Sequence, residues 1–109
     1  MKTIIVRSNE GTEKEVQAYK VGKLFAISKD LMGRGYRVTH LNTGASVGFA
    51  RPLKEARALF GCLEGSRLDW NFKDPQYVVS HKEYENEFRT FSQMIQASFR
   101  GLASLGGAQ

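Results

Sequence analysis

Apolar and polar residues alternate along much of the first half of the chain, and this pattern predicts strands. Short β-branched or alternating segments are separated by polar, glycine-containing stretches, as is typical of an antiparallel sheet. In the clearest pair, two alternating segments flank a turn at Asn42-Thr43-Gly44, which predicts a β-hairpin. The predicted strands are Thr3–Arg7, Glu15–Val21, Leu24–Ser28, Tyr36–Leu41 and Ala45–Phe49.

The alternation also predicts how this hairpin pairs. Its apolar residues share one face only if Val38 lies opposite Phe49 and His40 lies opposite Val47. That register requires an even-numbered loop, formed either by Thr43-Gly44 or by residues 42–45. The other face is then predicted to be exposed, small and polar, and it carries Arg37, Thr39, Ser46 and Gly48.

Helical spacing dominates the second half of the chain. Arg51-Pro52-Leu53 predicts a helix start because proline is favoured in a first turn, and Gly65 predicts the end of that helix. The alternating Leu68–Phe72 predicts one more strand. A capping box at Ser80–Glu83 predicts the start of the last helix. This helix carries an apolar stripe made of Tyr84, Phe88, Phe91, Ile95 and Phe99.

Together these elements predict an α+β fold in the order β-β-β-β-β-α-β-α. We expect an antiparallel sheet of about four to six strands, with two helices packed on one face because an amphipathic sheet needs such a cover. Residues 1–100 are predicted to form a single domain and residues 101–109 a flexible, glycine-rich tail. The predicted core consists of Leu24, Phe25, Ile27, Val38, Val47, Phe49, Leu59, Trp70, Phe88, Phe91 and Ile95.

Composition narrows the class of protein. The chain has 109 residues, of which 41% are apolar, a fraction too high for a disordered protein. It contains no apolar run long enough to cross a membrane and no signal-peptide pattern, so we expect a cytoplasmic protein without membrane contact. One cysteine excludes an internal disulfide framework and a cysteine-based zinc site. No cofactor and no metal are expected.

The distribution of charge points to a class of partner. The formal net charge is +5, and residues 1–54 hold ten basic and four acidic side chains, a net charge of +6. Such an uneven field favours a nucleic acid or an acidic, nucleic-acid-binding protein, although a basic surface that is merely solvated gives the same pattern. The leading hypothesis is a non-enzymatic nucleic-acid-binding module. Its predicted contact residues are Lys23, Lys29, Arg34, Arg37, Thr39, Ser46 and Arg51.

A weak resemblance bears on the hairpin. The segment from Tyr36 to Leu63, a hairpin followed by a helix, is similar to the sheet-plus-helix arm-binding domains of phage-type integrases. The similarity covers about a quarter of the chain, and those domains present several basic residues on the sheet where this hairpin presents one. It implies double-stranded DNA contacts from Arg37, Thr39 and Ser46.

Other interpretations rest on smaller signals. Tyr19 is the only ring predicted to be exposed for base stacking, and residues 32–36 match phosphate-binding and RNA-binding loops only in part. A second hypothesis is a protein-interaction module, such as a small phage- or plasmid-encoded inhibitor of a host protein complex. The C-terminal helix offers a surface for a homodimer. A third hypothesis, an enzyme using His40 and Cys62, lacks the surrounding carboxylates that catalysis needs, so no activity is predicted.

Overall fold

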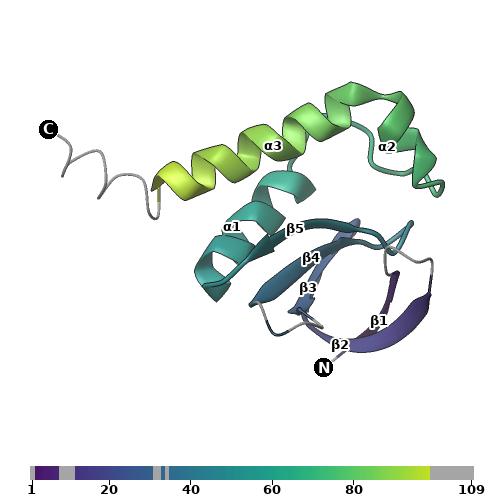
Figure 1. Cartoon of the computed structure of the whole chain (residues 1–109), viewed down its shortest axis with the longest axis vertical. Coiled ribbons are helices and arrows are strands. Elements are labelled where there is room, and N and C mark those ends of the chain that lie inside the picture. Colours follow the sequence, from purple (N-terminus) through teal and green to yellow (C-terminus); the bar gives the residue numbers. More distant parts are fainter. Residues whose placement is uncertain (1, 8–11, 31–32, 34, 99–109) are drawn as a thin grey trace, which may run out of the picture.

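The computed structural model describes residues 2–7, 12–30, 33 and 35–98. Five strands form one antiparallel sheet in which each strand pairs with its neighbours along the chain (Figure 1). Two long helices pack on this sheet, so the predicted α+β class and the helical cover are confirmed. The elements are β1 (Lys2–Arg7), β2 (Glu13–Val21), β3 (Phe25–Lys29), β4 (Tyr36–His40), β5 (Ser46–Ala50), α1 (Leu53–Glu64), α2 (Gln76–Ser80) and α3 (Lys82–Gln96).

The sheet curls strongly (Figure 1). Each of its faces buries a core of its own. A bulge in β2 between Ala18 and Lys20 lets that strand bend. The β1–β2 hairpin therefore folds over the face that α1 and α3 leave uncovered, and the amide of Arg7 donates to the carbonyl oxygen of Gly44 at 2.7 Å. The smaller core beneath this hairpin contains Ile4, Val6, Ala18 and Ala26.

The β4–β5 hairpin pairs differently from the predicted register. Val38 lies opposite Gly48 instead of Phe49, and Val47 is the extra residue of a bulge. The physical reason is the close approach of the helices: a Cβ atom on residue 48 would lie 2.5 Å from Cδ2 of Leu59. A side chain there would have to push Leu59 and Phe88 aside, so glycine is favoured at this position and the larger Phe49 takes the other face, where it is 48% exposed. The amide of His40 bonds the carbonyl of Ala45. The turn therefore spans residues 41–44, even-numbered but one residue earlier than the longer predicted loop.

The helices begin and end close to the predicted positions, with one exception. Helix α1 lies between Pro52 and Gly65 as predicted. The capping box, however, is wrong: Ser80 ends the short helix α2, and α3 begins after His81 without a side-chain hydrogen bond to its first turn. The apolar stripe of α3 does pack onto the sheet, with Tyr84 and Ile95 buried. Phe99 and the predicted tail lie outside the described residues.

The predicted strand at Leu68–Phe72 is also wrong, because its backbone groups are bonded to side chains instead of to another strand. The carbonyl of Trp70 accepts a hydrogen bond from His40, and the carbonyl of Asp69 accepts one from the hydroxyl of Tyr84. The amide of Asn71 donates to the carboxylate of Asp69 at 3.0 Å. An extended segment held in this way buries its tryptophan without joining the sheet.

Most of the predicted core is confirmed. Six of the residues are buried and four are half-buried against them; only Phe49 is exposed. The buried ones are Phe25, Ile27, Val38, Leu59, Trp70 and Ile95, and the half-buried ones are Leu24, Val47, Phe88 and Phe91.

Candidate functional site

Two of the predicted nucleic-acid contacts are inside the protein. Arg37 is 6% exposed and Thr39 is fully buried, because the β1–β2 hairpin covers the face that the alternation pattern assigned to solvent. A duplex cannot reach this face, so the predicted groove contacts from Arg37 and Thr39 are wrong. Two of the three sheet contacts implied by the similarity to integrase arm-binding domains are therefore lost.

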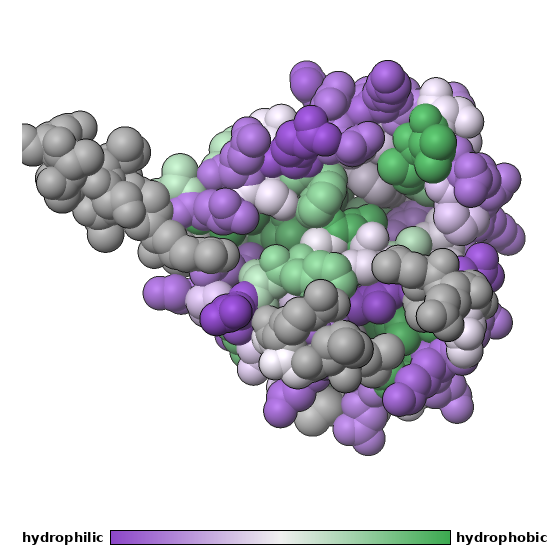
Figure 2. Space-filling model, viewed as in Figure 1, coloured by the Kyte–Doolittle hydropathy of each residue, from purple (hydrophilic) through white to green (hydrophobic). Residues whose placement is uncertain are grey.

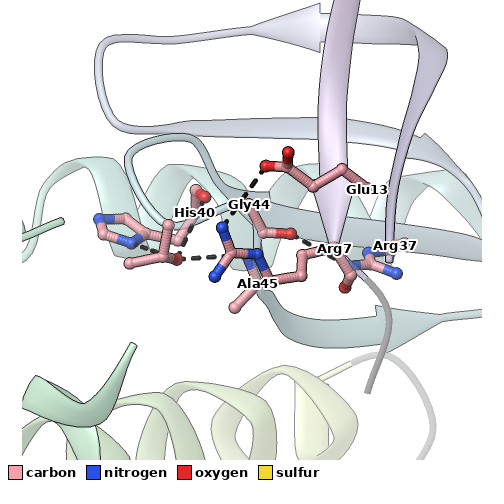
Figure 3. A network of polar contacts seen from close by, with 7 residues as sticks. Arg7, Glu13, Arg37, His40, Gly44 and Ala45 are labelled. Atoms are coloured by element: carbon pink, nitrogen blue, oxygen red, sulfur yellow. Dashed lines mark hydrogen bonds and ion pairs between the residues drawn. The ribbon is translucent and has the colours of Figure 1, made fainter. Parts of the chain in front are cut away.

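Arg37 instead joins three parts of the fold (Figure 3). Its Nη2 group donates to the carbonyl of Arg7 at 2.9 Å and to that of Gly44 at 3.3 Å. Its Nε group donates to the hydroxyl of Thr39 at 3.2 Å. Burial lowers the pKa of Arg37, whereas the nearby charge of Asp30 raises it. The guanidinium thus stays charged and fastens β1 to the β4–β5 turn.

The remaining predicted contacts divide between the two ends of the sheet. Lys29 and Arg51 are exposed, and both lie at the end where β3 stops and β4 begins. Lys23 is exposed at the opposite end, in the turn before Phe25. Ser46 is half-buried at that same opposite end, and Arg34 lies outside the described residues.

The first of these ends combines cations with aromatic rings. Tyr36 pairs with Lys29 on one side and with Ala50, which precedes Arg51, on the other. Its ring also meets that of Tyr19, with centroids 5.4 Å apart and planes at 75°. Tyr19 is 43% exposed, as its predicted role requires. We name this group of Tyr19, Lys29, Tyr36 and Arg51 the aromatic–basic cluster.

Comparison with known proteins adds no assignment. The chain matches no family model, no curated protein and no solved structure. Within the described residues, no helix has the length and apolar character needed to span a bilayer. The same part of the chain brings together no three histidine, cysteine or acidic side chains as a metal site.

His40 is a buried titratable group at the end of β4, and both of its ring nitrogens have partners. Its Nε2 atom lies 2.6 Å from the carbonyl of Trp70, and its Nδ1 atom lies 3.0 Å from the hydroxyl of Thr43. Because a carbonyl only accepts, Nε2 carries the proton and the neutral ring accepts at Nδ1. The Thr43 oxygen accepts in turn from the amide of Ala45 at 3.2 Å.

These bonds weigh against the enzyme hypothesis. A base that activates Cys62 would need a free ring nitrogen directed at the thiol. His40 uses both nitrogens within the fold, and His81 directs Nδ1 to the carbonyl of Tyr77 while stacking on that ring at 3.8 Å. Cys62 is half-buried against the core.

The Tyr84 phenol has a structural role. Burial, with Tyr77 beside it, raises the pKa of Tyr84 to about 12, so its hydroxyl stays protonated and donates a hydrogen bond to the carbonyl of Asp69.

Stability should depend on pH through His40. Burial lowers its pKa below the ordinary value of 6.5, the hydrogen bond to Trp70 opposing this in part. The unfolded chain therefore takes up a proton more readily than the folded one, and the free energy of unfolding should fall as pH drops below about 6.5. One such proton changes it by at most about 1.4 kcal/mol per pH unit.

Urea unfolding followed by circular dichroism between about pH 7.5 and about pH 5.5 would test this expectation. The variant His40→Gln keeps a donor for the Trp70 carbonyl and should have a flatter profile than His81→Gln, which removes the other histidine. Parallel profiles for the two variants would contradict the expectation.

Sequence reasoning missed how these residues come together. Tyr36 packs against the core, as the alternation of its strand predicts, but it also joins the aromatic–basic cluster. Thr43 lies in the predicted turn, but it also orients His40. A threonine three residues after a histidine at a strand end is too common a pattern to reveal such a contact. The cluster depends on pairing across three strands, which periodicity within one strand does not report.

Proposed function

We propose that this protein is a non-enzymatic module that binds nucleic acid through the aromatic–basic cluster. The observation that carries the proposal is a grouping at one end of the sheet: exposed Lys29 lies directly across from Tyr36, and the exposed Tyr19 lies against the Tyr36 ring. Exposed Arg51 follows Ala50, the other cross-strand partner of Tyr36. Cations beside accessible rings are the combination that single-stranded nucleic acids require, since cations follow the phosphates and rings stack on the bases. The excess positive charge of residues 1–54 supports it.

The cluster favours a single strand over a duplex. The sheet face that would enter a groove is covered by the β1–β2 hairpin, and Arg37 and Thr39 are engaged beneath it. The cluster instead lies at an end of the sheet, where a tyrosine ring can meet an unstacked base. Nearby exposed cations on α1, Lys54 and Arg57, add attraction for a phosphate backbone.

Fluorescence anisotropy with labelled single- and double-stranded DNA and RNA tests the proposal. Binding should weaken steeply between about 50 mM and about 200 mM salt. The double variant Lys29→Glu/Arg51→Glu should lose at least about tenfold in affinity and about two units of salt slope. Tyr19→Ala should lose about tenfold for single strands and little for duplexes, because stacking is lost while charge is kept.

A charge-matched control separates this surface from net charge. Lys82→Glu/Arg67→Glu changes two exposed basic residues remote from the cluster and alters the net charge equally. It should retain most of the affinity. Equal losses in both double variants would show unspecific attraction, and no binding of the unaltered protein at the lower salt would overturn the proposal.

Protein interaction is the second candidate function, and one observation favours it. Phe49 is 48% exposed on β5, an edge strand whose outer side pairs with no other strand of the described sheet. An apolar ring on an open edge suits a partner that adds a strand there. The phage- or plasmid-encoded inhibitor considered above would use such a surface. It becomes the preferred proposal if the anisotropy experiment detects no nucleic-acid binding.

A further inference from the structure

The bulge in β2 turns two consecutive side chains towards the same face of the sheet. In a regular strand, Tyr19 and Lys20 would point to opposite faces. Here the Tyr19 ring meets that of Tyr36 at 5.4 Å. The ammonium group of Lys20 lies 5.1 Å from the centre of the Phe60 ring. Both partner rings belong to the larger core, under the helices, so the bulge has brought an aromatic ring and a cation to one side.

Lys20 and Lys29 stand on either side of Tyr19 along the sheet. Lys20 pairs with Ile27 of β3, and Lys29 lies two residues further along that strand. Lys29 shares the face of Ile27, because alternate residues of a regularly paired strand point the same way. Tyr19 precedes Lys20 in the antiparallel β2, so it lies between the two cations. All three side chains are exposed.

The positive charge of Lys20 is available to an anion. Within the described part of the chain, Lys20 forms no ion pair, and its ammonium group rests on the Phe60 ring. Glu64, one turn further along α1, directs its Oε2 atom to the amides of Leu24 and Phe25, at 3.0 and 2.9 Å. A ring contact orients a long side chain and leaves its charge in place. Lys20 thus presents a positioned cation beside Tyr19.

This order of groups matches the chemistry of a nucleotide within a strand, which has a phosphate on each side of its base. A base stacked on Tyr19 has one phosphate on the side of Lys29 and the other on the side of Lys20. The surface around them also suits a charged ligand. Figure 2 shows hydrophilic side chains over β2, at the bottom of the view, whereas apolar side chains gather between α3 and β5.

We propose that Lys20 is a further nucleic-acid contact, which binds the second of the two phosphates that flank the base on Tyr19. The inference rests on the proposed function and deepens it. It gives the strand a direction across the sheet, from Lys29 at the end of β3, past Tyr19, to the Phe60 side of α1. The recognised unit is one nucleotide with both phosphates, and every base can occupy it because every base can stack.

Fluorescence anisotropy with labelled oligothymidine tests this role of Lys20. Lys20→Gln should weaken binding about fivefold at about 100 mM salt and lower the salt slope by about 0.7, the contribution of one phosphate contact on a single strand. Lys20→Arg should retain most of the affinity. The control Lys14→Gln removes the same charge from the same strand, about 20 Å away, and should have little effect.

Thymidine 3′,5′-bisphosphate tests the two-phosphate arrangement directly. It should displace the labelled strand at a several-fold lower concentration than either thymidine monophosphate, and Lys20→Gln should remove that advantage. Equal affinities of Lys20→Gln and Lys14→Gln for the strand, or a bisphosphate no better than the monophosphates, would overturn this inference alone if Tyr19→Ala still weakens binding. No binding by the unaltered protein would overturn the proposed function and this inference with it.

Discussion

Replacing Trp70 by alanine should destabilise the protein by about 3–5 kcal/mol, which is a large part of the total stability expected for a domain of this size. Trp70 is 1% exposed, and its ring meets that of Phe25 at 5.2 Å and that of Tyr84 at 4.9 Å. Hydrogen bonds from His40 and Tyr84 hold the extended segment that carries the tryptophan, which limits how far this backbone can move to close the resulting cavity. Urea unfolding followed by circular dichroism measures the loss.

Phe49→Ala is the matched control for this prediction. The sequence pattern places Phe49 and Trp70 in the same core, but the structure leaves Phe49 48% exposed. Its removal should therefore lower the free energy of unfolding by less than about 1 kcal/mol. Similar losses for the two variants would mean that Phe49 packs inside and that the observed hairpin register is incorrect.

The second large effect is expected at Arg37. The variant Arg37→Ala should lose about 3 kcal/mol of stability, because it leaves the carbonyls of Arg7 and Gly44 without a charged donor in a buried place. Arg37→Lys should recover only part of the loss, since one ammonium group cannot reproduce the geometry of the guanidinium. Urea unfolding at neutral pH compares the three proteins.

Arg51→Ala distinguishes a structural arginine from an exposed one. Arg51 lies on the surface at the other end of β4, and its removal should change stability by less than about 0.5 kcal/mol. Equal stability of the Arg37→Ala and Arg51→Ala variants would contradict this prediction. That result would return Arg37 to the surface role that the alternation pattern gave it.

The strands, α1 and most of the core were predictable because they follow from periodicity within single segments. Helix α1 ends at Gly65 as its sequence indicates, and the alternating strands lie within a few residues of their predicted bounds. The hairpin register was not predictable in this way. It depends on how closely Leu59 and Phe88 approach Gly48, which is a contact between elements remote in the sequence.

The candidate site was predicted only in part for a related reason. Exposed cations such as Lys29 and Arg51 were identifiable from charge alone. The burial of Arg37 was not, because it results from the bend in β2 that brings the first hairpin over the sheet. A polar strand face with one arginine has the same pattern whether water or another hairpin covers it. Likewise, the segment around Trp70 alternates like a strand, but its hydrogen bonds end on His40 and Tyr84.

The order of strands in the sheet has a consequence for the folding pathway. Because each strand pairs with its neighbours along the chain, most of the sheet can form through short loops whose closure entropy is small. The contact of Arg7 with Gly44 is different, since it joins residues separated by most of the sheet sequence. We therefore expect the hairpins to form one after another along the chain. The closure of the β1–β2 hairpin over the smaller core has the largest entropic cost, so we expect it to be the last step.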